Sequence, residues 1–297
     1  MADSLPQLTL RTSDRGDGAV FDAFFAGYDR AFILPDEKED EAGLRACLEL
    51  NHGDARKTIE ARYGPFVEWV ALAEVNGAPV GGANLLATLV PDGCGGMQAT
   101  ANLNYVYLLP EARGRGLLRP LVAAVRGAVA ARFREGGAPL LFLEQNDPFR
   151  MTAEDYVRDS EAAGIDQVDR LRIWARLGAR IVDFPYVQPP LAPDRAPEDS
   201  LVYAVLGAPE DALSACVLGG HLRRFFAISV LKGAPIDTVA EVSRQLTALD
   251  ADCQRGASVA LLDPAPLLET LHGVPPQDGS GGFRDRLVAL EHRRERR

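Results

Sequence analysis

Lysine is the scarcest charged residue in this sequence. Only three of the 32 basic residues are lysines (Lys38, Lys57 and Lys232), and the 42 acidic residues give a formal net charge of −10. Phosphate contacts need a basic face, so this balance argues against a general nucleic-acid partner. The excess of arginine, with the abundance of alanine, glycine and proline, resembles a codon-composition bias, favours a bacterial origin and lowers the weight of any single arginine.

Cysteines and long apolar runs are also scarce. The four cysteines lie far apart without a C-x-x-C pair, which predicts neither a zinc site nor a disulfide framework and favours free thiols in a reducing cytoplasm. The four histidines are scattered, so no metal is assigned. The apolar run 215–231 is interrupted by His221, Arg223 and Arg224, which argues against a membrane-spanning helix. The first residues have neither a basic flank nor an apolar segment, so we expect no secretory signal and a cytoplasmic protein.

Hydrophobic periodicity predicts an α+β fold for residues 1–207. The expected order is strand, two helices, three strands, helix, strand, helix and two strands. Asn76-Gly77 separates two β-prone runs and is typical of a two-residue hairpin turn, which makes the three central strands an antiparallel meander. The strands are expected at residues 6–12, 66–75, 79–90, 97–109, 139–146, 180–187 and 200–207, and the helices from residue 19 and at 42–50, 118–134 and 170–178.

Residues 208–297 follow a different pattern. Their apolar residues have helical spacing at 209–231 and 235–254, and they do not repeat the first part of the chain. We therefore expect a domain at residues 1–207, with a mixed, mainly antiparallel central sheet flanked by helices. Residues 208–297 are expected to form a mainly helical C-terminal appendage, whose role the sequence leaves open.

A strand-to-helix junction within residues 105–133 carries the strongest functional signal. Its helix begins near Leu118 with unpaired N–H groups and the positive end of its dipole. Gly114 and Gly116 allow the backbone to turn tightly and to approach a ligand. Three arginines oppose the net charge of the chain here: Arg113, Arg115 and Arg119. An anion, most naturally a phosphate or pyrophosphate, is the ligand that such a junction favours.

The junction resembles one known phosphate loop better than two others. It lacks the G-x-x-x-x-G-K-[ST] pattern, and Arg119 stands where the third glycine of G-x-G-x-x-G belongs. Residues Arg113 to Leu118 resemble the signature loop [QR]-x-x-G-x-[GA] of the GCN5-related N-acetyltransferase (GNAT) superfamily, except that Leu118 replaces the final small residue. The order of elements over residues 6–207 also resembles this family. The alternative is an unrelated α+β domain with a structural turn.

The resemblance implies a cosubstrate and its contacts. The loop amides would hold the pyrophosphate of acetyl-CoA or another acyl-CoA, and the backbone at the end of the preceding strand would pair with the pantetheine arm. A backbone N–H there would hold the tetrahedral oxyanion. In the family an asparagine after the next strand and a tyrosine in the following helix face the cofactor. The expected cofactor-binding residues are Tyr107, Leu108, Arg113, Gly114, Arg115, Gly116, Leu117, Leu118, Asn146 and Trp174.

Three side chains are candidates for catalysis. An alkyl ammonium has a pKa of about 10.4, so a base or a water chain must take its proton. Glu144 follows three apolar residues in a strand, where burial would raise its pKa toward that of a base; the alternative is a solvent-facing strand-end glutamate. Tyr105 and Tyr107 share one face of their strand, where they line the acceptor pocket or pack in the core. Trp174 stands where the family has an acidic tyrosine, so Tyr156, Tyr186 or water would protonate the leaving thiolate.

Two polar features are open to more than one interpretation. Asn102 and Asn104 share one face of their strand, which favours a polar network or a substrate contact. Residues 147–169 form a longer link than is usual in the family and include Asp155 and Asp159. This segment covers the acceptor site and presents acids to a cationic amine, or it is a solvated surface helix.

The sequence as a whole predicts a cytoplasmic N-acyltransferase. We expect direct acetyl transfer from acetyl-CoA to an amine of a small molecule or peptide, without a metal, a nucleic acid or a membrane; a homodimer is left open. Trp174 and Leu118 motivate an alternative, a non-catalytic acyl-CoA-binding regulatory domain. A third class is a scaffold in which residues 208–297 are the working part.

Overall fold

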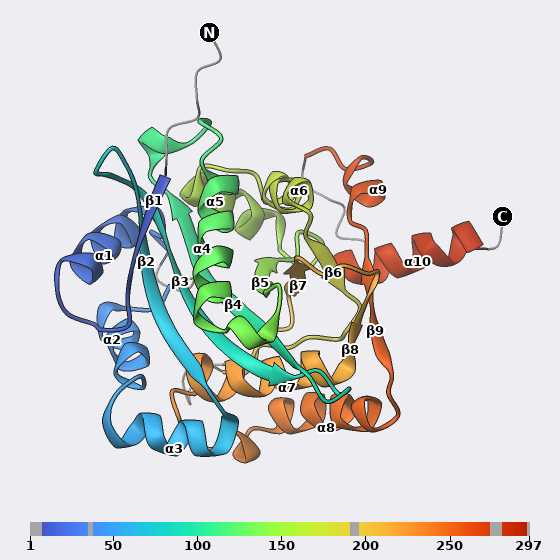
Figure 1. Ribbon diagram of the computed structural model, residues 1–297. Helices are drawn as coiled ribbons and strands as arrows, with labels where there is room; N and C mark the ends of the chain where they lie inside the picture. Colours follow the sequence, from blue (N-terminus) through green and yellow to red (C-terminus); the bar gives the residue numbers. More distant parts are fainter. Residues whose placement is uncertain (1–7, 35–37, 191–195, 274–280, 296–297) are drawn as a thin grey trace, which may run out of the picture. The chain divides into compact units, whose positions relative to one another are not determined.

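The computed structural model describes residues 8–34, 38–190, 196–273 and 281–295 (Figure 1). Its backbone divides into two compact units, one of Met1–Val90 and Met97–Pro139 and the other of Pro91–Gly96 and Leu140–Arg297. The expected α+β class, with mainly antiparallel strands and flanking helices, is confirmed. The boundary expected after residue 207 falls inside the second unit, and a domain division at that point stays a prediction.

Four strands in sequential order, β1-β2-β3-β4, form the sheet of the first unit. β1 pairs antiparallel with β2, and β2 pairs antiparallel with β3. Asn76 and Gly77 have φ angles of 53° and 76°, which are the positive values that the predicted hairpin turn needs. Part of the first expected strand, residues 6 and 7, lies outside the described residues. The strands are β1 (Leu8–Ser13), β2 (Phe66–Val75), β3 (Ala78–Pro91) and β4 (Met97–Leu108).

Helices pack on this sheet through apolar faces. Phe24 and Tyr28 of α1 are fully buried, and Asp40 caps α2 by accepting a hydrogen bond from the backbone N–H of Gly43 at 2.7 Å. In Figure 1, α4 crosses the front of the sheet. The helix α3 was not expected, because only Ile59 and Tyr63 of its residues are buried and its sequence is otherwise polar. The helices are α1 (Ala19–Ala31), α2 (Glu41–Glu49), α3 (Gly53–Tyr63) and α4 (Leu118–Arg132).

Five strands in the order β5-β7-β6-β9-β8 form the sheet of the second unit. The neighbouring strands pair antiparallel, and Glu144 of β5 lies directly opposite Tyr203 of β7. The short strands β8 and β9 were not expected in the C-terminal region, because a run of three to five residues has no clear period. The strands are β5 (Leu140–Asn146), β6 (Arg180–Val182), β7 (Leu201–Leu206), β8 (Ala212–Ser214) and β9 (Ser258–Leu262).

The helical character of the C-terminal region is otherwise confirmed. Helices α7 and α8 pack on each other, and α7 continues into a π-helical turn at Phe226–Val230. An additional helix, α5, lies within the polar segment 147–169. The helices of this unit are α5 (Ala153–Ala163), α6 (Gln167–Leu177), α7 (Ala215–Phe225), α8 (Ala240–Gln254), α9 (Ala265–Leu268) and α10 (Phe283–Glu295). Among the described residues, no helix has the length and apolar character needed to cross a membrane.

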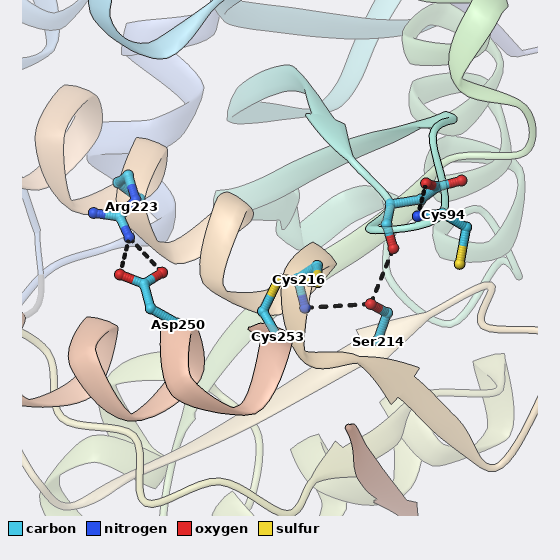
Figure 2. The surroundings of a disulfide bond; sticks show 7 residues. Cys94, Ser214, Cys216, Arg223, Asp250 and Cys253 are labelled. Carbon is cyan, nitrogen blue, oxygen red and sulfur yellow. Dashed lines mark hydrogen bonds and ion pairs between the residues drawn. A yellow bond between two sulfur atoms is a disulfide. The ribbon is translucent and has the colours of Figure 1, made fainter. Parts of the chain in front are cut away.

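A disulfide between Cys216 and Cys253 corrects the expectation of free thiols (Figure 2). Cys216 lies at the start of α7 and Cys253 near the end of α8, and the packing of the two helices brings their Cα atoms to 4.6 Å across a separation of 37 residues. Such a contact depends on tertiary structure, so cysteine spacing could not predict it. Cys47 and Cys94 do not form disulfides. The argument for a reducing compartment, which rested on free cysteines, loses this support.

The same two helices are joined by an ion pair. Arg223 of α7 donates to both carboxylate oxygens of Asp250 of α8, at 2.6 and 2.7 Å. At the start of α7, Ser214 caps the helix and donates to the backbone oxygen of Asp92 at 3.1 Å (Figure 2). The disulfide and the ion pair therefore join α7 to α8 at two points.

Candidate active site

The glycine loop between β4 and α4 has the backbone that an anion site requires. Gly114 and Gly116 have φ angles of 71° and 72°, a region that side chains other than glycine rarely adopt. A Cβ built at either position would have no protein atom within 4 Å. The open side of both glycines therefore allows a ligand to approach the backbone closely.

The loop and the first residues of α4 also offer unused donors. Within the described residues, the backbone N–H groups from Gly114 to Leu118 have no hydrogen-bond acceptor. No side chain caps the N-terminus of α4, and its first turn has no acidic residue. Most helices satisfy these donors with a capping side chain, so this helix start keeps its donors and its positive dipole end available to an anion.

The charged side chains around the loop differ in whether they contact the protein or are exposed. Arg113 donates from Nε to the backbone oxygen of Leu108 at 3.2 Å, so its side chain turns back onto the end of β4. Arg115 and Arg119 are exposed. The nearby carboxylate of Glu111 pairs with Arg30 at 3.4 Å. The loop therefore keeps a positive surface in a chain of net negative charge.

Tyr105 and Tyr107 are held within the first unit. Tyr107 is 5% exposed, and its hydroxyl donates to the backbone oxygen of Phe24 at 2.8 Å, while burial raises its pKa well above the ordinary value. The hydroxyl of Tyr105 accepts from the backbone N–H of Glu39 at 3.0 Å, and its ring meets that of Tyr28 edge-on at 4.9 Å. Of the two interpretations of these tyrosines, core packing describes Tyr107. Its side chain is occupied in the core, so only its backbone could contact a cofactor.

The predicted polar network of asparagines is present in the first unit. Asn102 donates to Asn104 at 3.0 Å, Asn104 donates to Asn84 at 3.1 Å, and Asn84 donates to the backbone oxygen of Trp69 at 3.0 Å. Asn102 and Asn84 are buried, whereas Asn104 is partly exposed. The chain of amides satisfies polar groups that would otherwise be costly to bury.

Glu144 lies in a polar cluster of the second unit, which we call the carboxylate cluster: Glu144, Tyr186, Gln188, Tyr203 and His221. The hydroxyl of Tyr186 donates to Oε1 of Glu144, and Nε2 of Gln188 donates to Oε2 at 3.3 Å. Burial raises the pKa of Glu144 to about 7, and the hydrogen bond from Tyr186 acts in the opposite direction. The partly buried carboxylate that the sequence predicted as a base is therefore able to exchange a proton near neutral pH.

Stacked rings surround this carboxylate. The ring of Tyr186 stacks on that of Tyr203 with centroids 4.3 Å apart, and the hydroxyl of Tyr203 lies 3.0 Å from Nε2 of His221. His221 is fully buried and stacks on Phe142 at 4.0 Å. Burial lowers the pKa of His221 to about 3, so its imidazole is neutral at physiological pH. Tyr203 and His221 were missed by sequence reasoning, because only the pairing of β5 with β7 and the packing of α7 bring them to Glu144.

Tyr156 and Asn146 contact acids of their own unit. The hydroxyl of Tyr156 donates to Oδ2 of Asp166 at 2.7 Å, and Asp166 caps α6. Burial and this hydrogen bond raise the pKa of Tyr156 well above the ordinary value, which makes it a poor proton donor. Nδ2 of Asn146 lies 3.5 Å from Oδ2 of Asp159.

The acids of α5 are paired within their own helix. Arg158 approaches both Asp155 and Asp159 at 3.0 Å. The apolar face of α6 buries Trp174, whose side chain is 6% exposed. No three histidine, cysteine, aspartate or glutamate side chains of the described ranges come together as a metal site.

Comparison with known proteins gives structural matches alone. No protein-family model matches the sequence, and no curated protein is similar to it. A Desulfovibrio desulfuricans protein described as a GNAT-family acetyltransferase is 18% identical, with a TM-score of 0.39. The match covers 67% of this chain and 98% of that protein's chain. The ribosomal-protein-S18-alanine N-acetyltransferase of Escherichia coli is 15% identical, with a TM-score of 0.35, and covers 69% and 98%. An aminoglycoside 6′-N-acetyltransferase complexed with coenzyme A is 15% identical, with a TM-score of 0.37, and covers 68% and 99%.

These TM-scores are below 0.5, so none of the likenesses determines what this chain binds or does. We infer what the chain binds or does from its own features, which are the open glycines, the unused amides and the carboxylate of Glu144. The solved structures to which the chain is similar at this low identity are described as acetyltransferases.

Proposed function

We propose that the protein transfers an acyl group, most simply acetyl, from acyl-CoA to an amine. The observation that carries the proposal is the glycine loop, where two residues with positive φ and five backbone N–H groups without acceptors precede a helix that has no capping side chain. A diphosphate matches such a set of unused donors and the positive helix end. The resemblance of Arg113 to Leu118 to the acyl-CoA loop of acetyltransferases selects CoA among diphosphates.

Each element of the loop would have a separate role. The amides from Gly114 to Leu118 would hold the pyrophosphate, and the exposed Arg115 would add charge. The backbone of Tyr107 and Leu108 would run beside the pantetheine arm and place one N–H near the thioester oxygen. The backbone oxygen of Leu108 already accepts from Arg113, so an amide of the arm that donates to that atom would use its second lone pair.

Glu144 is the proposed general base. An alkyl ammonium has a pKa of about 10.4, so the amine must lose a proton before its nitrogen can attack. A carboxylate with a pKa of about 7 accepts that proton better than an ordinary glutamate would. The nitrogen then forms a bond with the thioester carbon and loses its second proton to water, the oxyanion collapses, and the C–S bond breaks. The hydroxyls of Tyr156 and Tyr186 already donate to Asp166 and Glu144, so we assign the protonation of the CoA thiolate to water.

The acceptor is an amine of a small molecule or peptide. Asp155 and Asp159, which we expected to attract a cationic amine, already pair with Arg158, and this pairing reduces their net charge toward an acceptor. We therefore assign α5 no electrostatic role in attracting the acceptor.

Release of free thiol from acetyl-CoA across a panel of amines tests this function. We expect thiol release that depends on the amine and increases with pH near 7, and its loss in Glu144→Gln. The exposed Glu154 on α5 provides the matched control, because Glu154→Gln changes the same functional group outside the carboxylate cluster. Binding of acetyl-CoA without thiol release on any amine would instead favour a regulatory acyl-CoA-binding domain, and absence of binding would refute both functions.

A further inference from the structure

Helix α8 of the C-terminal region reaches the loop between Tyr186 and Gln188 through one buried amide. Gln245 is 3% exposed. Its Oε1 accepts from the backbone N–H of Val187 at 3.0 Å, and its Nε2 donates to the backbone oxygen of Val187 at 2.8 Å and to that of Glu241 at 3.1 Å. One side chain therefore satisfies both backbone groups of a single residue in the loop between β6 and β7.

Val187 stands between the two residues that contact Glu144. The side chains of Tyr186 and Gln188 donate to different oxygens of that carboxylate. Gln188 is held on its other side by two backbone hydrogen bonds with Glu198, each 2.9 Å long. A rotation of the Val187 peptide would move both donors. The hydrogen bonds from Gln245 hold that peptide in place, and so they fix the positions from which Tyr186 and Gln188 donate to Glu144.

We propose that Gln245 is a positioning residue for Glu144, which makes α8 and the C-terminal region part of the catalytic unit. This inference rests on the proposed function for its catalytic meaning, but the arrangement of the donors can be measured without turnover. Gln245 does not touch Glu144; it acts through Tyr186 and Gln188.

The position of Gln245 is itself fixed by the packing of α8. The neighbouring Leu246 and Leu249 are buried. The disulfide between Cys216 and Cys253 and the ion pair between Arg223 and Asp250 hold α8 against α7 (Figure 2). The helix therefore behaves as a rigid support from which one amide reaches the loop.

The other titratable groups near Glu144 come from different elements. Tyr186 lies in the loop after β6, Tyr203 lies on β7, and His221, which is influenced by the charge of Arg224, lies on α7. His221 stays neutral near pH 7 because burial lowers its pKa to about 3. Burial raises the pKa of Tyr186 and that of Tyr203 well above the ordinary value, so both hydroxyls stay protonated. A change in the titration of Glu144 between pH 5 and 9 would therefore report on its donors.

Titration of Glu144 in Gln245→Met tests the proposal. Methionine fills a similar volume and offers no strong hydrogen bond, and Gln254→Met, at the exposed end of the same helix, is the matched control. The ¹³C carboxyl signal of Glu144, identified by its absence in Glu144→Gln, is followed against pH. A hydrogen bond to the charged form lowers a pKa, so loss of both donors should raise the midpoint by about one unit, tenfold in proton affinity.

The pH profile of turnover gives the second readout. A midpoint raised from about 7 to about 8 leaves about a tenth of Glu144 ionised at pH 7, so kcat/KM should fall about fivefold there and recover at pH 9. A merely structural role would lower stability and leave the profile in place. Gln245→Asn, whose amide is one methylene shorter and can contact Val187 through water, should give a smaller shift in the same direction.

The outcomes separate the two proposals. Wild-type turnover with an unchanged Glu144 midpoint in Gln245→Met overturns the positioning role alone. A shifted midpoint in a protein that releases no thiol supports the positioning role and refutes the acyltransferase function. If Gln245→Met does not fold, the midpoint of Gln245→Asn decides, and equality with the wild type overturns the inference.

Discussion

The replacement Glu144→Gln should make the protein more stable at neutral and alkaline pH. The pKa of Glu144 is raised from 4.5 to about 7, so between these values the native state binds more protons than the unfolded state. Stability therefore falls as pH rises through this window, by at most 1.36 kcal/mol per pH unit, and the loss is complete above about pH 7. The total is about 3 kcal/mol from the 2.5-unit difference.

Glutamine does not carry this penalty. Its carbonyl oxygen can still accept from Tyr186, but its amide group faces the donor of Gln188, so one hydrogen bond is lost at about 1 kcal/mol. That loss does not depend on pH. The difference in unfolding free energy between Glu144→Gln and the wild type should thus rise by about 3 kcal/mol in favour of the variant from pH 4.5 to pH 8.

The two tryptophans allow the second unit to be followed by itself. Trp69 lies in the first unit and Trp174 in the second. In a Trp69→Phe background, the fluorescence of Trp174 during urea unfolding at pH 5, 6, 7 and 8 reports on the unit that contains Glu144. The exposed Glu154→Gln should track the wild type at every pH. Parallel stability curves for Glu144→Gln and wild type would refute the burial argument and, with it, the basis for a general base at this position.

Two further predictions concern stability. Cys253→Ser removes the disulfide that closes a loop of 37 residues, so the free energy of unfolding of the second unit should fall by about 4 kcal/mol. A reducing agent should have the same effect on the wild type and none on the variant. Equal stability of the oxidised and the reduced wild type would contradict this prediction. Tyr107→Phe removes the hydrogen bond from the tyrosine hydroxyl to the backbone oxygen of Phe24, so unfolding of the first unit, followed by Trp69 in a Trp174→Phe background, should lose about 0.5–1.5 kcal/mol while acetyl-CoA affinity changes little. A large loss of affinity without a loss of stability would instead place the Tyr107 side chain in the cofactor site.

Elements with strong local signals could be predicted from the sequence. The hairpin at Asn76-Gly77 follows from turn chemistry, and α4 follows from the spacing of Leu121, Val125 and Val129. The polar helix α3 and the short strand β9 were missed because their local patterns are weak and their packing partners decide their conformation.

The candidate site divides in the same way. The glycine loop is contiguous, so its residues could be named before their φ angles were known. The carboxylate cluster joins Glu144 to Tyr203 through strand pairing and to His221 through helix packing, and no local spacing relates these residues. Cys216 and Cys253 are likewise 37 residues apart in the sequence, and only the packing of α7 against α8 brings them together.

Titration of acetyl-CoA into glycine-loop variants tests the central claim most directly. An alanine at Gly116 must adopt a φ of 72°, at a cost of about 1–2 kcal/mol, and its Cβ would occupy the open side proposed for the ligand. Gly127→Ala in α4 is the matched control, because a Cβ there also meets no protein atom and its φ is ordinary. Calorimetry should show at least a tenfold loss of affinity, about 1.4 kcal/mol or more, for Gly116→Ala and none for Gly127→Ala. Equal affinity of Gly116→Ala and wild type would contradict the claim that this loop holds the diphosphate of coenzyme A.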